Sequence, residues 1–481
     1  MSLNIRTTGS NALSILTSDV MNRATSFVLY ALVARHLGTE AFGQLSLAFT
    51  LFYVFQVFAV GGLKTLVVRQ VAKDRSRTSA YFVNGCLIVT LSSCASIGAL
   101  LGFVRLMHYP SRTALVVLLL SSGLLAYAVS AVCEGIFQAW ERMRYIAYVN
   151  VPVNAAKIGA AVLLLQANAG LLAVVLVLVS SLAFVAVIES WVVIRRFPSP
   201  RASVDVRLAM ETMRSAGTFL GIDGTLAVMT SVNVLLLAKL RTDSEVGLYS
   251  AATQLTVPLL LVCQSIAQSI FPVLCQEITS GLQHQKRIVV QAIRLLLVVA
   301  LPAVVALVVA GDQVLEIVYR NPAFAAAFPA VQILAWVLIL QVFTSVLGQV
   351  LIASNRERAT LRIVVVDTLV NGLLGWPVIQ RFGLRGAAAV LLCTKAVDCC
   401  QHYFLVSRLF GGFQLIGILW KPVVAATAIA TYLALGRHRV DAVSGGVSAA
   451  FIYGAALLVL AIWTSGGLRR FRERYFPAPS D

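Results

Sequence analysis

The sequence predicts an all-α polytopic membrane protein with about fourteen transmembrane helices, in two pseudo-symmetric six-helix lobes followed by two C-terminal helices. Hydrophobic residues make up 59% of the 481 residues and charged residues only 12%, with a mean hydropathy of +0.87. The apolar runs reach the roughly 20 residues that a helix needs to cross a bilayer, and short polar segments separate them. This composition excludes a soluble globular protein.

The N-terminal lobe is predicted over residues 1–195. Its six helices are expected at residues 11–37, 44–70, 79–104, 113–139, 145–166 and 171–195. A polar turn over residues 34–43 joins the first two helices, because Gly38 and Gly43 give the backbone freedom that a tight reversal needs. The linker at residues 196–211 contains Pro198 and Pro200, which cannot continue a helix comfortably, and it marks the predicted lobe boundary.

The C-terminal lobe is predicted over residues 212–409. Its helices are expected at residues 212–240, 246–275, 287–311, 327–353, 359–380 and 384–409. Residues 410–481 add helices at 416–435 and 446–466 and a basic tail. Shifting the sequence so that Asp19 lies on Asp223 also lays Gly43 on Gly247. Such a repeat is expected of a transporter whose halves are related by an axis along the membrane normal.

Two short motifs carry a family resemblance. Residues 34–43 read A-R-H-L-G-T-E-A-F-G, and residues 246–252 read V-G-L-Y-S-A-A. Their characteristic residues are Arg35, Gly38, Phe42, Gly43, Gly247 and Tyr249. With the hydropathy profile, these motifs resemble the Wzx-type polysaccharide and lipid-linked oligosaccharide flippases of the multidrug/oligosaccharidyl-lipid/polysaccharide exporter (MOP) superfamily.

The resemblance implies a function as well as a fold. Wzx-type proteins move polyprenyl-pyrophosphate-linked oligosaccharide repeat units from the cytoplasmic to the outer leaflet by alternating access, for surface polysaccharides such as O-antigen. Cation- or potential-coupled transport is expected by the same resemblance. The implied partners are an undecaprenyl-pyrophosphate-linked glycan, membrane lipid, and a polysaccharide polymerase and chain-length regulator.

The placement of Lys and Arg predicts the orientation. Basic residues are dense at 69–77 and 195–207, so these segments, the linker and both termini are predicted to face the cytoplasm. The membrane is predicted to be a bacterial cytoplasmic (inner) membrane. The net charge of +18 then follows from topology and anionic lipid, and no nucleic-acid partner is expected. The histidines are scattered, with no H-E-x-x-H, P-loop or G-x-S-x-G context, so no enzyme is expected.

Several basic residues lie inside the predicted helices. They are Arg23, Lys64, Lys157, Arg214, Arg294 and Lys395. A charge at the bilayer centre costs about 2.5 to 3.5 kcal/mol, so such side chains should face protein or a water-filled cavity. Arg214 and Arg294 lie near helix ends, where they could instead extend to the interface.

Helical spacing places some of these cations on polar faces. Asp19, Asn22 and Arg23 share one face of the first helix, and Asn150, Asn154 and Lys157 share one face of the fifth. Because guanidinium and ammonium groups bind phosphate well, a pyrophosphate-linked substrate is predicted to contact these faces. The predicted substrate-binding residues are Arg23, Lys64, Asn150, Asn154, Lys157 and Lys395. The structural alternative is that the local pairs Asp19–Arg23 and Lys395–Asp398 only hold helices together.

Oxygen-bearing residues predominate on the seventh, eleventh and twelfth helices. The predicted cation-coupling residues are Asp223, Asp367, Asn371, Thr394 and Asp398. Carboxylate and neutral oxygens suit Na⁺, and a carboxylate could equally carry H⁺; interhelical hydrogen bonding is the open alternative. No other cofactor or metal is expected. Two alternative functions stay open, a lipid II flippase and a multidrug cation antiporter, although the basic first lobe favours an anionic substrate.

Overall fold

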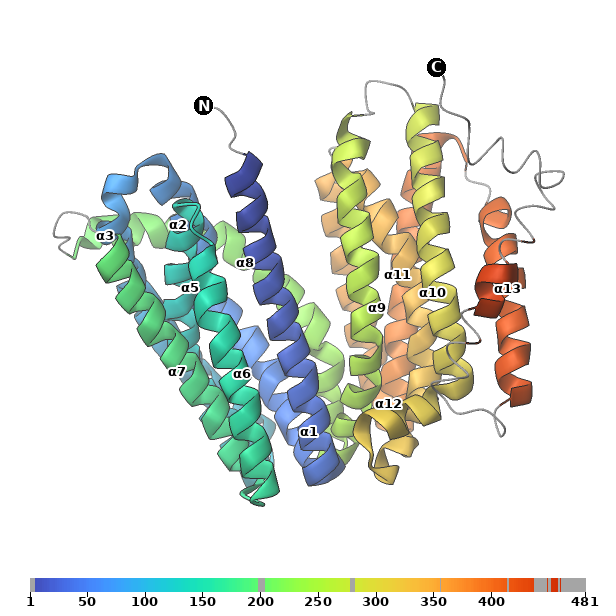
Figure 1. Cartoon of the computed structure of the whole chain (residues 1–481), viewed down its shortest axis with the longest axis horizontal. Coiled ribbons are helices and arrows are strands. Elements are labelled where there is room, and N and C mark those ends of the chain that lie inside the picture. The colour runs from blue at the N-terminus through green and yellow to red at the C-terminus, as the bar shows by residue number, and fades with distance from the viewer. Residues whose placement is uncertain are drawn as a thin grey trace. The chain divides into compact units, whose positions relative to one another are not determined.

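The computed structural model describes residues 5–197, 204–276, 282–354, 356–412 and 415–436, together with 448, 451–456 and 459. Within this part of the chain nearly all residues are helical (Figure 1). The residues divide into two compact units, Met1–Gly247 and Leu248–Asp481. The division falls one turn into the helix α9 (Asp243–Gln276).

The first unit is a bundle built around α1. Its helices are α1 (Ile5–Val60), α2 (Leu63–Lys73), η1 (Arg75–Arg77), α3 (Thr78–Met107), α4 (Ser111–Ser121), α5 (Leu124–Ala139), α6 (Arg144–Gln166), α7 (Gly170–Arg196), α8 (Val206–Leu240) and the start of α9 (Asp243–Gln276). α1 packs against α3, α4, α6 and α8, and α5 packs against α2, α3 and α7 (Figure 1). A buried core of aliphatic and aromatic side chains packs around α2, at the end of this unit where α3 and α6 begin and α5 and α7 end.

Glycines set the breaks in the first unit. The loop predicted over residues 34–43 is wrong in extent, because α1 is interrupted only at Gly38, whose φ of 81° and ψ of −171° favour glycine. The second predicted helix therefore begins just after Gly38. It breaks at Gly61 and Gly62, where φ is 58° and 72°, and continues as α2.

The second unit consists of long helices with one sharp reversal. Its further elements are α10 (Leu282–Tyr319), η2 (Pro322–Ala327), α11 (Phe328–Ala353), α12 (Glu357–Phe410) and α13 (Leu415–Gly436). α11 packs against α10 and α12, and α10 also packs against α13. Gly383 interrupts α12 with a φ of 56°, at the boundary predicted between the eleventh and twelfth helices.

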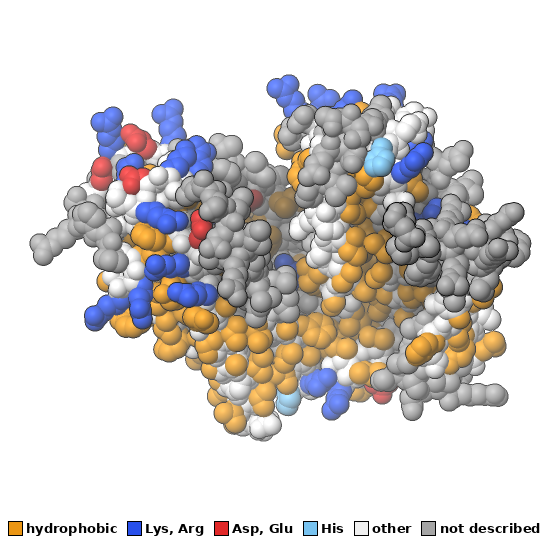
Figure 2. Space-filling model, turned by 45° about the horizontal axis from the view of Figure 1, so that its top comes forward, with side chains coloured by type: hydrophobic (Ala, Val, Ile, Leu, Met, Phe, Trp, Pro, Cys, Tyr) orange, Lys and Arg blue, Asp and Glu red, His pale blue; other side chains and the backbone are white. Residues whose placement is uncertain are grey.

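The described helices suit a membrane. Ten stretches are long and apolar enough to cross a bilayer, and two of them, Met21–Lys73 and Arg358–Phe410, are 53 residues long and cover two predicted helices each. Hydrophobic side chains cover much of the visible face in Figure 2, while Lys and Arg gather toward its edges. Exposed apolar side chains of this kind are stable in lipid, so the chain is a multi-pass membrane protein.

Two sequence predictions about organisation are not decided by these helices. The contacts divide the chain at Gly247 and leave α8 packed on α1, α2 and α3, whereas the predicted lobe boundary lies at residues 196–211. That boundary stays a prediction about the internal repeat. The predicted helix at 446–466 lies mostly outside the described residues, so the count of fourteen helices also stays a prediction.

Candidate functional site

The reversal of α12 builds a buried polar cluster in the second unit. A Cβ on Gly386 would lie 2.5 Å from the backbone oxygen of Val378, so the two halves of α12 meet closely only because this residue is glycine. Side by side, the halves bring Asp367 to Gln401, whose amide nitrogen donates a 3.1 Å hydrogen bond to the Asp367 carboxylate. Asp367 is only 2% exposed.

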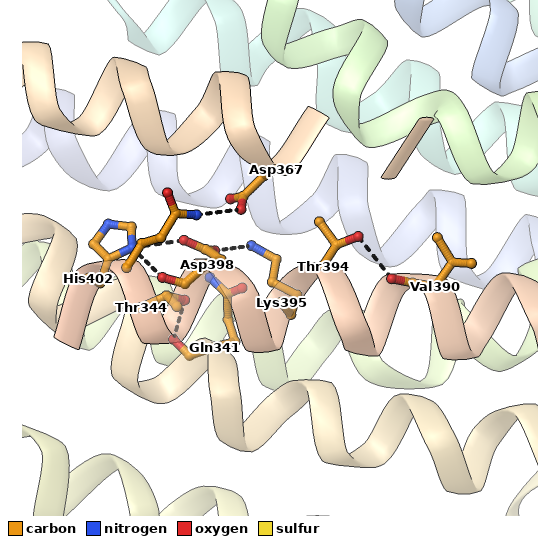
Figure 3. Close-up of polar contacts among 9 residues, drawn as sticks. Gln341, Thr344, Asp367, Val390, Thr394, Lys395, Asp398 and His402 are labelled. Carbon is orange, nitrogen blue, oxygen red and sulfur yellow. Dashed lines mark hydrogen bonds and ion pairs between the residues drawn. The ribbon is translucent and has the colours of Figure 1, made fainter. Parts of the chain in front are cut away.

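Asp398 is the centre of this cluster. Lys395, Asp398 and His402 lie at i, i+3 and i+7 on one face of α12. The Lys395 ammonium donates to Asp398 Oδ2 at 2.9 Å, and His402 Nδ1 lies 2.8 Å from Asp398 Oδ1. Figure 3 shows the two basic side chains reaching the same carboxylate, with Asp367 approaching from another segment. The Lys395–Asp398 pair, which was the structural alternative, is therefore present, and substrate binding by Lys395 stays a prediction.

Two further predicted cation-coupling residues, Thr394 and Asn371, also lie on α12 and carry neutral side-chain oxygens. Thr394 is buried and donates its hydroxyl to the backbone oxygen of Val390 at 2.9 Å. Asn371 is also buried, and its side-chain oxygen has no hydrogen-bond partner in the described part of the chain. Asp223, by contrast, lies on α8 in the first unit, with an exposed side chain.

The charges of the cluster decide what it can bind. Asp367 and Asp398 bring two carboxylates, and the half-buried Lys395 supplies one cation, to Asp398. No group of three or more His, Cys, Asp and Glu side chains in the described residues could hold a metal ion. The arrangement is suited to exchange of a proton or a single monovalent cation, because the ammonium offsets only one of the two negative charges.

The polar faces predicted on the first and fifth helices meet in the first unit. α1 and α6 pack side by side, and the Asn154 amide nitrogen on α6 donates to the Asn22 side-chain oxygen on α1 at 2.5 Å. Lys157 donates to the Asn154 side-chain oxygen at 2.6 Å. No described carboxylate pairs with Lys157. The ammonium is thus held by an amide, and no described side chain compensates its charge.

Other predicted residues flank this amide chain. Asn150 lies one turn before Asn154, and its side-chain nitrogen is buried without a hydrogen-bond partner among the described residues. Arg23 follows Asn22 on α1 and is exposed. The side chain of Asp19 lies outside the described residues, so the alternative Asp19–Arg23 pair stays open.

Lys64 has a partner that sequence reasoning missed. Its ammonium on α2 forms an ion pair with Glu134 on α5. Glu189 on α7 is 0% exposed, interacts electrostatically with the pair and accepts a hydrogen bond from Ser130. The charge of Lys64 is therefore largely compensated. Glu134 and Glu189 stand inside long apolar runs, and that position in the sequence could have singled them out.

The motif residues build a close helix crossing in the first unit. A Cβ on Gly43 would lie 1.7 Å from the backbone oxygen of Asp243, and one on Gly247 would lie 2.1 Å from that of Thr39. Asp243 accepts hydrogen bonds from Gln44 at 3.2 Å and Thr113 at 2.5 Å. These contacts explain the two glycines by packing. Tyr249 lies in the second unit and is buried.

Two aromatic residues lie close to this crossing: Phe42 precedes Gly43, and Tyr109 interacts with Asp243. Phe42 is fully buried and packs edge-on against Tyr30, with ring centroids 5.4 Å apart. Tyr109 lies between α3 and α4, and burial, with a further contribution from the Asp243 carboxylate, raises its pKa to about 12. The phenol is therefore neutral at physiological pH.

The sequence matches two known protein families and several curated proteins. The family described as "Polysaccharide biosynthesis protein" matches residues 8–278, and the MatE family matches residues 225–376. The probable low-salt glycan biosynthesis flippase Agl15 of Haloferax volcanii is 28% identical over 194 residues, 40% of this chain and 41% of its own length. Stage V sporulation protein B of Bacillus subtilis is 22% identical over 505 residues, 95% of this chain and 96% of its own length.

Solved structures share the fold. A lipid II flippase MurJ in an inward closed conformation aligns with a TM-score of 0.74 and 13% identity, over 95% of this chain and 99% of that one. An inward-facing multidrug resistance MATE family transporter of the MOP superfamily aligns with a TM-score of 0.62 and 14% identity, over 80% of this chain and 94% of that one. At these identities the likeness concerns the fold alone.

Long membrane-crossing helices with ionised side chains buried among them define a polytopic protein of the MOP transporter fold. Because its family match covers more than half of its length, the chain belongs to the polysaccharide biosynthesis protein family, within the MOP superfamily.

Proposed function

We propose that this protein is a flippase that moves polyprenyl-pyrophosphate-linked oligosaccharides from the cytoplasmic to the outer leaflet for surface polysaccharide assembly such as O-antigen. The observation that carries the proposal is Lys157, a cation in the middle of α6 held by Asn154 and by no described carboxylate. Family membership and the glycan flippase Agl15 among the relatives support the same class of substrate.

The charge of Lys157 needs an anion inside the membrane. A pyrophosphate offers several negative oxygens, and each charge-assisted hydrogen bond from an ammonium contributes about 1.5 to 3 kcal/mol. The amides of Asn22, Asn150 and Asn154 add hydrogen-bonding groups suited to the glycan. An interior-negative potential helps export, because each negative charge that moves outward gains about 2.3 kcal/mol per 100 mV.

Coupling is proposed for the second unit. Asp367, Asp398 and His402 can together take up and release one proton or monovalent cation, since Lys395 leaves one negative charge uncompensated. We place the protein in a bacterial inner membrane with both termini in the cytoplasm, following the distribution of basic residues. Labelling of Glu40→Cys from outside intact cells tests this orientation, and labelling only in opened cells would reverse it.

A substrate panel tests the function. Purified protein in vesicles receives a labelled undecaprenyl-pyrophosphate oligosaccharide, lipid II or a cationic dye, and the movement of each between leaflets is followed. The oligosaccharide is expected to move fastest, and Lys157→Ala is the matched inactive control. Faster movement of lipid II would favour the peptidoglycan precursor as substrate, and extrusion of the dye alone would contradict an anionic substrate.

A further inference from the structure

A groove runs between α6 and α7 on the first unit, beside Lys157. Its volume is about 560 Å³, and its lining includes Tyr148, Pro152, Ala156, Ala160 and Phe184. Phe184 is 58% exposed, so the groove is open at its rim. Buried Val149, Val153 and Val185 pack together beneath it. The groove is thus a feature of a packed helix pair.

The lining is apolar except at one point. The hydroxyls of Ser180 and Ser181 donate to the backbone of their own helix, to Val177 at 3.1 Å and Leu178 at 2.7 Å, and offer little to a ligand. Lys157 is the charged residue of the lining. Small side chains at Ala156 and Ala160 leave α6 open on this face. The groove therefore suits a hydrocarbon chain that carries an anion.

The depth of Lys157 identifies that anion. α6 has 23 residues, close to the thickness of the hydrocarbon core, and Lys157 lies about 20 Å along it from Arg144. The ammonium therefore lies near the middle of the bilayer. A resident phospholipid keeps its phosphate at the interface, about 15 Å away. Only a lipid whose phosphate crosses the bilayer brings its charge to this point.

We propose that the α6/α7 groove holds the isoprenyl units next to the pyrophosphate of the polyprenyl substrate, while Lys157 pairs with the pyrophosphate itself. The proposal rests on the proposed function and adds a binding site to it. During transport the headgroup lies on the Asn22–Asn154 side of Lys157 and the hydrocarbon chain on the α7 side. Lys157 thus lies at the boundary between the polar side, which contacts the headgroup, and the apolar groove, which contacts the hydrocarbon chain.

Photo-crosslinking tests the groove directly. Benzoylphenylalanine replaces Ala156 or Ala160 in the groove, and Leu163, which is 68% exposed on the same helix and outside the lining, is the control position. The full-length protein is reconstituted in phosphatidylethanolamine–phosphatidylglycerol vesicles with labelled undecaprenyl pyrophosphate. We expect labelled crosslinks at Ala156 and Ala160 that greatly exceed those at Leu163. Adding Lys157→Ala should weaken them about tenfold to a hundredfold, as for loss of a charge-assisted hydrogen bond.

The contrary outcomes are distinct. Crosslinks to phospholipid alone, or equal labelling at Leu163, would overturn the groove proposal while leaving flipping of the oligosaccharide intact. Failure of flipping with undecaprenyl crosslinks retained would instead overturn the proposed function. As a second measurement, Ala160→Trp fills the groove and should slow flipping about tenfold, whereas Leu163→Trp should not. Normal flipping by a folded Ala160→Trp protein would also contradict the groove.

Discussion

Two lysines inside the membrane differ in what compensates their charge. In the second unit Lys395 lies 2.9 Å from Asp398, whose other oxygen contacts His402. In the first unit the partner of Lys157 among the described side chains is the amide oxygen of Asn154 at 2.6 Å. A paired lysine belongs to a closed network of charges, whereas an amide-held lysine keeps a charge that, under the proposed function, is available to an external anion. The same residue type therefore has a different electrostatic environment in each unit.

The largest expected effect on stability comes from breaking the paired lysine. Asp398→Leu leaves the half-buried Lys395 without its carboxylate and should lower the free energy of unfolding by about 3 kcal/mol. The double variant Lys395→Met, Asp398→Leu should recover most of the loss. Thermal unfolding in detergent measures both.

Lys157→Met is the matched comparison in the first unit. Because this lysine has no described carboxylate partner, its removal leaves no buried charge behind, and the melting temperature should change little. A destabilisation as large as that of Asp398→Leu would show that the two lysines do not differ in the way described.

Sequence spacing predicted the local part of both sites. The i, i+3 spacing of Lys395 and Asp398, and the shared face of Asn154 and Lys157, follow from helical periodicity alone. The Gly383 boundary was equally predictable from the sequence. These are local features, set within one or two helical turns.

Tertiary contacts could not be predicted in this way. Glu134 meets Lys64, and Gln401 meets Asp367, across 70 and 34 residues of chain, and only the packing of helices brings them together. The same holds for the groove between α6 and α7, because a cavity depends on side chains from both helices. The loop predicted at residues 34–43 failed because a single glycine, Gly38, suffices to interrupt α1.

A smaller effect is expected at the coupling residues. Asp367→Asn keeps an oxygen for Gln401 but removes the charge, so stability should change by about 1 kcal/mol or less. The dependence of transport on Na⁺ or H⁺ should weaken, because the cluster then has no uncompensated carboxylate. Transport is measured in vesicles across Na⁺ and pH gradients, with Thr368→Ser on the same helix as control. Unchanged ion dependence would leave these oxygens with a structural role only.

A pH-dependent effect is expected at Tyr109, which lies outside the membrane-crossing stretches. Its pKa of about 12 is higher than the usual value of 10, so the neutral phenol contributes stability that is fully present below pH 10. That contribution is lost as the pH rises through about 12, and amounts to about 1 to 2 kcal/mol. The free energy of unfolding of the wild type and of Tyr109→Phe, measured between pH 9 and 12, gives this contribution, because the variant lacks the titrating phenol. Identical pH dependence of the two proteins would exclude a contribution from Tyr109.

The most direct test of the central claim is transport by a charge series at Lys157. At equal expression, Lys157→Arg should keep partial activity because it keeps the charge, whereas Lys157→Ala and Lys157→Glu should block export and make undecaprenyl-linked oligosaccharide accumulate in the cytoplasmic leaflet. The measured quantity is the fraction of lipid-linked oligosaccharide accessible from outside. Normal export by Lys157→Glu would contradict the account, because a reversed charge cannot bind a pyrophosphate.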